Sequence, residues 1–168
     1  MDLPVRKNHR LPAESYSSPD CCYFFTICTH DRSPLFTNHQ LAQSIIESLL
    51  WRHHKGVWNL HCYCLMPDHL HIIVGIKRDG SQSMNAGARG SVSKGILDQI
   101  AEFKRYTAHL WHKSEEAGPL WQRSSFDSII DQLELVDDLI LYVLNNPVRK
   151  GLAKCWEDYP YCGKLDIL

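Results

Sequence analysis

The sequence predicts an α+β fold of the ferredoxin-like kind, in which an antiparallel sheet follows the order β-α-β-β-α-β and an extra C-terminal helix is added. Three observations predict it. Four short segments are rich in β-branched, aromatic and aliphatic residues. Two stretches between them repeat apolar residues every three or four positions, as helices do. The two middle β segments are separated only by Pro67-Asp68, which indicates a hairpin.

Length and composition bound what the chain can be. Its 168 residues are typical of one domain, and we expect an extended tail over residues 1–20 before a single domain at 21–168. Seven cysteines without a C-x-x-C pair, and no signal-peptide core, predict reduced thiols in the cytoplasm. No apolar run approaches the roughly 20 residues that cross a bilayer, so no membrane partner is expected. The net charge of −1 means that any binding of nucleic acid must be local.

The first half of the chain predicts three strands and one helix. Residues 22–29 (CYFFTICT) form the first strand, which the turn-rich segment 30–34 ends. Thr37 or Asn38 is a candidate N-cap, and the apolar spacing that follows predicts a helix ending near Gly56. Residues 58–66 and 69–76 then form the central hairpin.

The second half predicts a helix, a strand and a last helix. Residues 78–93 are rich in Gly, Ser and Asn and have no hydrophobic period. A helix follows, with a predicted buried stripe of Ile96, Ile100, Phe103, Thr107 and Leu110. Residues 120–130 (LWQRSSFDSII) predict the fourth strand. Asp131 and Glu134 have the spacing of a capping box for the last helix, which ends at Asn145-Asn146-Pro147.

Two histidines on the second strand of the hairpin form a candidate metal site. Side chains of a strand alternate between faces, so His69 and His71 share one face and Leu70, Ile72 and Val74 the other. Neutral imidazoles on adjacent same-face positions can converge on one divalent metal ion. A half-buried strand that carries histidines by chance has the same pattern, so a third ligand is needed to distinguish the two.

Tyr142 and Asn146 lie one turn apart on the shoulder of the last helix. If that helix covers the histidine face, the carbonyl oxygen of Asn146 can serve as the third ligand, and Tyr142 can lie beside a metal-bound phosphate. Each residue also has a simpler structural role. Tyr142 suits the boundary between a core and solvent, and Asn146 suits a helix end before a proline.

Four stretches together carry a resemblance to a known family. They are FFTICTHDRSPLF (24–36), YCLMPDHLHIIV (63–74), LWQRSSFDSII (120–130) and YVLNNPVRKGLA (142–153). In this order and combination they resemble the small single-tyrosine HUH transposases of bacterial insertion sequences, and most of all the REP-associated tyrosine transposases. Asn146 stands where insertion-sequence members commonly have Gln, and REP-associated relatives share the Asn.

The resemblance implies a metal-dependent endonuclease and strand transferase that acts on single-stranded DNA near a hairpin. In that reading His69 and His71, with Asn146, hold Mg²⁺ or Mn²⁺, and Tyr142 attacks a phosphodiester to leave a 5′-phosphotyrosine and a free 3′-OH. A homodimer is one possible state of such a protein. Because imidazoles bind metal only when neutral, metal affinity is expected to fall as the pH drops through roughly 6 to 7.

Basic residues scattered along the chain are candidate DNA contacts, although each cluster alone is equally typical of a solvated surface. The candidates are Arg6, Lys7, Arg10, Lys104, Arg105, Arg123, Arg149 and Lys150. Two alternatives to the transposase function are a domesticated hairpin-binding protein that no longer cuts DNA and a metal-dependent hydrolase that acts through water.

Overall fold

The predicted order of strands and helices is confirmed by the computed structural model of the chain, which describes residues 16–76, 95–114, 117–132 and 134–165. One five-stranded antiparallel sheet has the order β4-β1-β3-β2-β5, so its first four strands have the ferredoxin-like order. The strands are β1 (Cys22–Cys28), β2 (Asn59–Met66), β3 (His69–Gly75), β4 (Phe126–Ile130) and β5 (Cys162–Lys164). The helices are α1 (His39–His54), α2 (Ile96–Lys113), α3 (Glu134–Leu144) and α4 (Asn146–Arg149).

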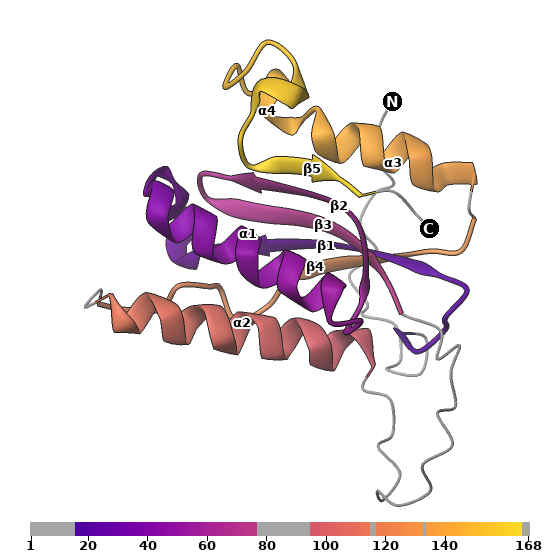
Figure 1. The fold of residues 1–168 in the computed structure, drawn as a ribbon, viewed down its shortest axis with the longest axis horizontal. Coiled ribbons are helices and arrows are strands. Elements are labelled where there is room, and N and C mark those ends of the chain that lie inside the picture. Colours follow the sequence, from indigo (N-terminus) through magenta and orange to yellow (C-terminus); the bar gives the residue numbers. More distant parts are fainter. Residues whose placement is uncertain (1–15, 77–94, 115–116, 133, 166–168) are drawn as a thin grey trace, which may run out of the picture.

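The helices cover both faces of the sheet, and each face has its own hydrophobic core (Figure 1). Helices α1 and α2 pack on the first face, where side chains such as Phe25, Leu70 and Ile72 form the larger core. Helix α3 packs on the second face, over residues such as Phe24 and Ile73. The alternation of side chains along β1 and β3 therefore divides the protein into two helical layers with the sheet between them.

A side-chain cap explains where α1 begins. Of the two candidate N-caps, Thr37 and Asn38, Asn38 caps α1, because its side chain accepts a hydrogen bond from the backbone N–H of Leu41. Short 3-10 turns follow β1 and precede α1, and another precedes β5; they span His30–Arg32, Leu35–Thr37 and Trp156–Asp158.

Two predictions about strands are corrected. The fourth strand is shorter than 120–130, because only Phe126–Ile130 pairs with β1. Upstream of it, Trp121 forms an isolated bridge with Thr29 and donates its indole N–H to the hydroxyl of Thr107, so this segment closes the end of the first core instead. The edge strand β5 was not predicted, since three residues (CGK) are too few to show a period.

Two predictions about helices also change. The predicted buried stripe of α2 ended at Leu110, but this residue is only half-buried. The stripe ends instead at the buried Trp111, four residues after Thr107. The last helix ends at Leu144, but Pro147 does not end helical structure. It lies in the first turn of α4, where a missing N–H costs nothing.

The predicted tail falls mostly outside the described residues. Its last part is described, and there Tyr16 is buried, stacks on Tyr23 with ring centroids 6.0 Å apart and donates its hydroxyl to Asp127. Among the helices of the described ranges, none is long and apolar enough to cross a membrane.

Candidate active site at the paired histidines

The β2–β3 hairpin carries the paired histidines onto the second face of the sheet. The turn at Pro67-Asp68 places His69 at the start of β3, where it pairs with Cys28 of β1 and Met66 of β2. His71 follows two residues later and stacks on the ring of Phe24, a member of the second core, at 5.5 Å between centroids. Leu70, Ile72 and Val74 belong to the first core, so the prediction that they and the histidines occupy opposite faces is confirmed.

The two imidazoles point their Nε2 atoms at each other. These atoms lie 3.1 Å apart, and each ring is held by its other nitrogen. Nδ1 of His69 lies 2.5 Å from Oδ1 of Asp68, and Nδ1 of His71 lies 2.8 Å from the hydroxyl oxygen of Thr26. Histidines that bind metals are commonly oriented by such outer hydrogen bonds.

This arrangement fits a divalent metal ion. The carboxylate of Asp68 can only accept, so the ring of His69 carries its proton on Nδ1 and presents a lone pair at Nε2. If His71 donates its Nδ1 proton to Thr26, both Nε2 lone pairs face the same space, and a cation there would relieve their repulsion. The two Nε2 atoms are close enough together for both to bind one divalent ion. The donor set therefore suits an ion, with His69 and His71 as ligands.

Burial keeps both imidazoles neutral. It lowers the pKa of His71 to about 3, with further contributions from His69, Arg149 and Arg32. Burial also lowers the pKa of His69, against the opposing effect of Asp68. Burial alone would raise the pKa of Asp68, but its bond to His69 and the charge of Arg32 outweigh this and lower it. The pH at which protons compete with a metal is thus expected below the 6 to 7 that unperturbed histidines suggest.

Thr26, Asp68 and Arg32 surround the pair and were not among the predicted site residues. Nη1 of Arg32 lies 3.5 Å from Oδ2 of Asp68. Asp31 and Arg32 have positive φ angles of 52° and 56°, a conformation that non-glycine residues rarely adopt and that is often kept at functional sites. Two signals in the sequence point to these residues. Alternation along β1 places Thr26 on one face with Phe24, and Arg32 lies in the HDRSP turn that directly follows this strand.

A third ligand of the usual acidic or sulfur type is not offered by the described part of the chain, which contains no cluster of three His, Cys, Asp or Glu side chains suited to a metal. The predicted third ligand, Asn146, is buried at the junction of α3 and α4. Its Nδ2 donates to the carbonyls of Tyr142 and Val143 at 3.1 and 3.0 Å, and its Oδ1 accepts from Nη2 of Arg149 at 2.8 Å. Ligation by Asn146 stays a prediction.

Tyr142 lies near the end of α3, on the same side of the sheet as the histidines. It is half-buried against the second core, and the guanidinium carbon of Arg149 lies 4.0 Å from the centroid of its ring. The prediction that the last helix covers the histidine face is confirmed, because the second core joins α3 to Ile73 of β3.

The remaining predicted DNA contacts are spread over both layers. Lys104 of α2 donates to the backbone carbonyls of Gln122 and Arg123 at 2.8 and 3.0 Å, so its ammonium helps to hold that segment. The side chains of Arg105, Arg123 and Lys150 are exposed. Arg6, Lys7 and Arg10 lie outside the described residues.

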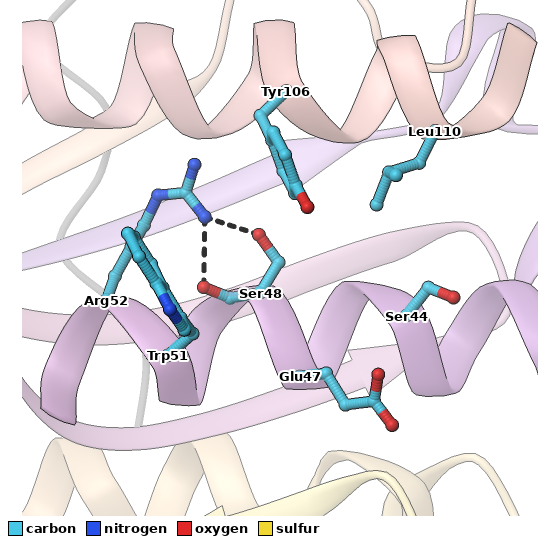
Figure 2. Close-up of a pocket in the computed structure, with 7 residues that line it drawn as sticks. All are labelled: Ser44, Glu47, Ser48, Trp51, Arg52, Tyr106 and Leu110. Carbon is cyan, nitrogen blue, oxygen red and sulfur yellow. Dashed lines mark hydrogen bonds between the residues drawn. The ribbon is translucent and has the colours of Figure 1, made fainter. Parts of the chain in front are cut away.

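A cavity of about 550 Å³ between α1 and α2 belongs to the first layer and contains none of the predicted site residues (Figure 2). Arg52 is buried there, and its Nη1 donates to the carbonyl and hydroxyl oxygens of Ser48. The guanidinium lies within 6.0 Å of the ring centroids of Trp51, Trp58, Phe103 and Tyr106. These contacts explain how a charged side chain joins the two helices, since cation–π attraction offsets part of its lost hydration.

Comparisons with known proteins agree with this architecture. The family model for "Transposase IS200 like" proteins matches residues 17–143, a range that includes both histidines and Tyr142. A Haemophilus influenzae protein named as a REP-associated tyrosine transposase is 24% identical over 142 residues, which cover 83% of this chain and 77% of that protein. A second, uncharacterized protein of the same organism is 27% identical over 161 residues, covering 85% and 88% of the two chains.

A solved structure has the same fold. It is a REP-associated tyrosine transposase bound to a REP hairpin, and it superposes with a TM-score of 0.63 at 19% identity, covering 94% of this chain and 82% of the other. Since the family model spans most of the chain and the fold agrees, this chain belongs to the IS200-like transposase family, and it is similar to the REP-associated tyrosine transposases.

Proposed function

We propose that this chain is a divalent-metal-dependent endonuclease and strand transferase for single-stranded DNA, which cuts beside a hairpin through a 5′-phosphotyrosine on Tyr142. The observation that carries the proposal is the pair of Nε2 atoms 3.1 Å apart, each ring oriented through its Nδ1. A transposase family and a tyrosine on the helix covering that face make phosphodiester chemistry the natural use of such a site.

The reaction would use Tyr142 as the nucleophile. Its phenolic oxygen loses its proton and bonds to phosphorus, while the bond from phosphorus to the 3′ oxygen breaks and that oxygen takes up a proton. The 5′ phosphate is left on the tyrosine, and the upstream fragment of the same strand ends in a 3′-OH. The covalent link conserves the energy of the phosphodiester, so a second 3′-OH can reverse the step without ATP. A bound Mg²⁺ or Mn²⁺ would offset negative charge on the phosphate.

The protein's own residues prepare this step. Asp68 and Thr26 orient the two metal-binding imidazoles, and burial keeps those rings neutral and available. Arg32 adds positive charge beside them, which suits an anionic strand. Asn146 is the expected third ligand.

The proposed DNA substrate is single-stranded around the cut and carries a hairpin nearby. A phenol on a helix has little reach into a stacked duplex, so the reacting nucleotide must be unpaired. The solved relative bound to a REP hairpin supports a hairpin partner for this chain as well.

Covalent capture tests the proposal. The protein is incubated with labelled hairpin oligonucleotides that have single-stranded flanks, in Mn²⁺, and the products are separated on a denaturing gel. We expect a protein–DNA adduct that disappears in Tyr142→Phe, while hairpin binding and the melting temperature change little because the ring is kept. Tyr106→Phe, in the other helical layer, is the matched control and should still form the adduct.

Each contrary outcome identifies another function. Cutting without an adduct would mean that water is the nucleophile and the protein is a hydrolase. Hairpin binding without any cutting across the oligonucleotide pool would indicate a DNA-binding protein that has lost the reaction. An adduct that persists in Tyr142→Phe would place the nucleophile elsewhere.

A further inference from the structure

Arg149 is exposed, and its guanidinium is bonded to other groups of the protein, although its sequence context suggested a DNA contact. Its Nη1 lies 3.3 Å from the carbonyl oxygen of Tyr142, and its Nη2 donates to Oδ1 of Asn146 at 2.8 Å. The same guanidinium covers the ring of Tyr142, with 4.0 Å between its central carbon and the ring centroid. The side chain of Arg149 thus contacts the backbone and the ring of Tyr142, the proposed nucleophile, and also the side chain of Asn146 one helical turn away.

These contacts lie at the C-terminal end of helix α3, where backbone carbonyls lack partners within the helix. Here Asn146 and Arg149 supply donors to the carbonyls of Tyr142 and Val143. The contacts connect the end of α3 to α4 and fix the backbone from which the phenol projects. The guanidinium also lies over the ring of Tyr142, and cation–π attraction favours this placement of the ring.

We infer that Arg149 is a positioning residue, which holds the phenol of Tyr142 in its reacting orientation instead of binding a DNA phosphate. The inference rests on the proposed function, since it assigns Arg149 a part in the reaction of Tyr142. Its chemistry requires arginine, because a planar cation can stack on the ring and donate from two nitrogens at once, whereas the ammonium of lysine is a point charge. A displacement of about 1 Å in a reacting group can slow a reaction roughly 100-fold.

The alternative, a phosphate contact, makes different predictions. A side chain that neutralises one phosphate contributes about 0.7 to 0.9 to the slope of log affinity against log salt. Its loss weakens binding, and a lysine in its place restores much of the contact. A positioning residue changes the rate of the bound complex and leaves the salt slope alone.

The test compares Arg149→Lys with the wild type and with Lys154→Gln, which removes an exposed cation a few residues away. Hairpin affinity is measured at several salt concentrations, and the rate of adduct formation is measured in a single turnover at saturating DNA. We expect Arg149→Lys, and also Arg149→Gln, which removes the charge, to slow adduct formation about 10- to 100-fold with unchanged affinity and salt slope. A phosphate contact would instead weaken binding and make the salt slope shallower in Arg149→Gln. Lys154→Gln should form the adduct at the wild-type rate.

A second readout does not depend on activity. The aromatic ring signals of Tyr142 are assigned by NMR in metal-free, DNA-free protein with the help of Tyr142→Phe. In Arg149→Lys they should shift, because the stacked guanidinium is gone, while those of Tyr106 stay in place. Unchanged ring signals, or a lower affinity with a shallower salt slope, would overturn the inference. If the wild type forms no adduct, the proposed function fails, and the ring signals alone decide whether Arg149 positions Tyr142.

Discussion

At the scale of single residues, the site is defined by how each imidazole is held. His69 and His71 would be ordinary strand residues if their rings could rotate freely. Asp68 and Thr26 remove that freedom by bonding the two Nδ1 atoms, so that the Nε2 atoms meet. Because Asp68 precedes His69 directly and Thr26 comes from a neighbouring strand, local and tertiary contacts each orient one ring.

Replacing Asp68 by Asn should weaken binding of Mn²⁺ about 10- to 100-fold. The neutral amide holds the Nδ1 proton of His69 less firmly, so the ring loses its fixed tautomer and orientation. A titration that follows the signal of free Mn²⁺ by electron paramagnetic resonance measures the change. Asp31→Asn, which alters an exposed carboxylate in the adjacent turn, is the control, and equal losses in both variants would contradict the orienting role of Asp68.

The buried histidine His61 should make stability depend on pH. Burial, and then the nearby His53, lower its pKa in the folded protein. Below about pH 6.5 the unfolded chain therefore binds protons that the folded protein does not, so the free energy of unfolding falls as the pH drops. The loss is at most about 1.4 kcal/mol per pH unit for each such histidine.

Urea unfolding of metal-free protein between pH 7.5 and 5 measures this dependence. His61→Gln removes one of the histidines with a lowered pKa. Its free energy of unfolding should therefore fall less steeply with decreasing pH than that of the wild type. An unchanged slope would show that His61 takes up its proton in the folded protein as readily as in the unfolded chain.

At the scale of secondary-structure elements, β3 and α3 make the site possible. Strand β3 sends its even-numbered apolar residues into the first core and its histidines to the second face. Helix α3 carries the tyrosine and is attached to that face by its own stripe, which includes Val136, Ile140 and Val143. Two helices share the first core, whereas α3 is the long helix over the second among the described residues.

Truncating one buried isoleucine in each layer should separate these roles. Ile45 of α1 and Ile140 of α3 are 0% and 1% exposed, so replacing either by Ala should lower the free energy of unfolding by about 2 to 5 kcal/mol. Ile140→Ala should also speed hydrogen exchange of the α3 amides through local opening, with α2 remaining protected. Equal protection of α3 in both variants would show that α3 opens only when the whole domain unfolds.

At the scale of the whole molecule, charge and layering limit where DNA can bind. A net charge of −1 gives no general attraction to a polyanion, so binding depends on local cations. Arg32 and Lys150 contribute positive charge on the side of the sheet that carries the histidines, where both affect the pKa of His69. Lys104 belongs to the opposite helical layer, and its ammonium is bonded to the 122–123 backbone.

The basic N-terminal segment remains a predicted part of the DNA interface. Deleting residues 1–12 removes Arg6, Lys7 and Arg10, so hairpin affinity should fall and its salt dependence should become shallower. The melting temperature should change little, because the core residues in the part of the chain that the structure describes begin at Tyr16. Fluorescence anisotropy at several salt concentrations measures both quantities, and an unchanged affinity would exclude these three residues as contacts.

The sequence by itself determined the elements and the faces, because these depend on local patterns. The alternation along β3 placed the histidines on one face, the helical period identified α1 and α2, and the cap of α1 was predicted at Thr37 or Asn38. The same patterns did not predict the structure of short or interrupted segments. The three residues of β5 are too few for a period, and the segment around Trp121 has strand-like composition but is positioned by the core that it closes.

Only the tertiary structure decided how the site residues are held. Some of their partners are distant in the chain, and some side chains could have bound either DNA or other groups of the protein. Thr26 reaches His71 across 45 residues, and the burial that lowers the pKa of His71 to about 3 results from packing of the whole second face. Arg149 could have faced DNA or the protein, and nothing in the spacing of a Y-x-x-x-N-P-V-R segment decides between them. In the fold, α4 brings the guanidinium over the ring of Tyr142, which is the contact from which we infer its positioning role.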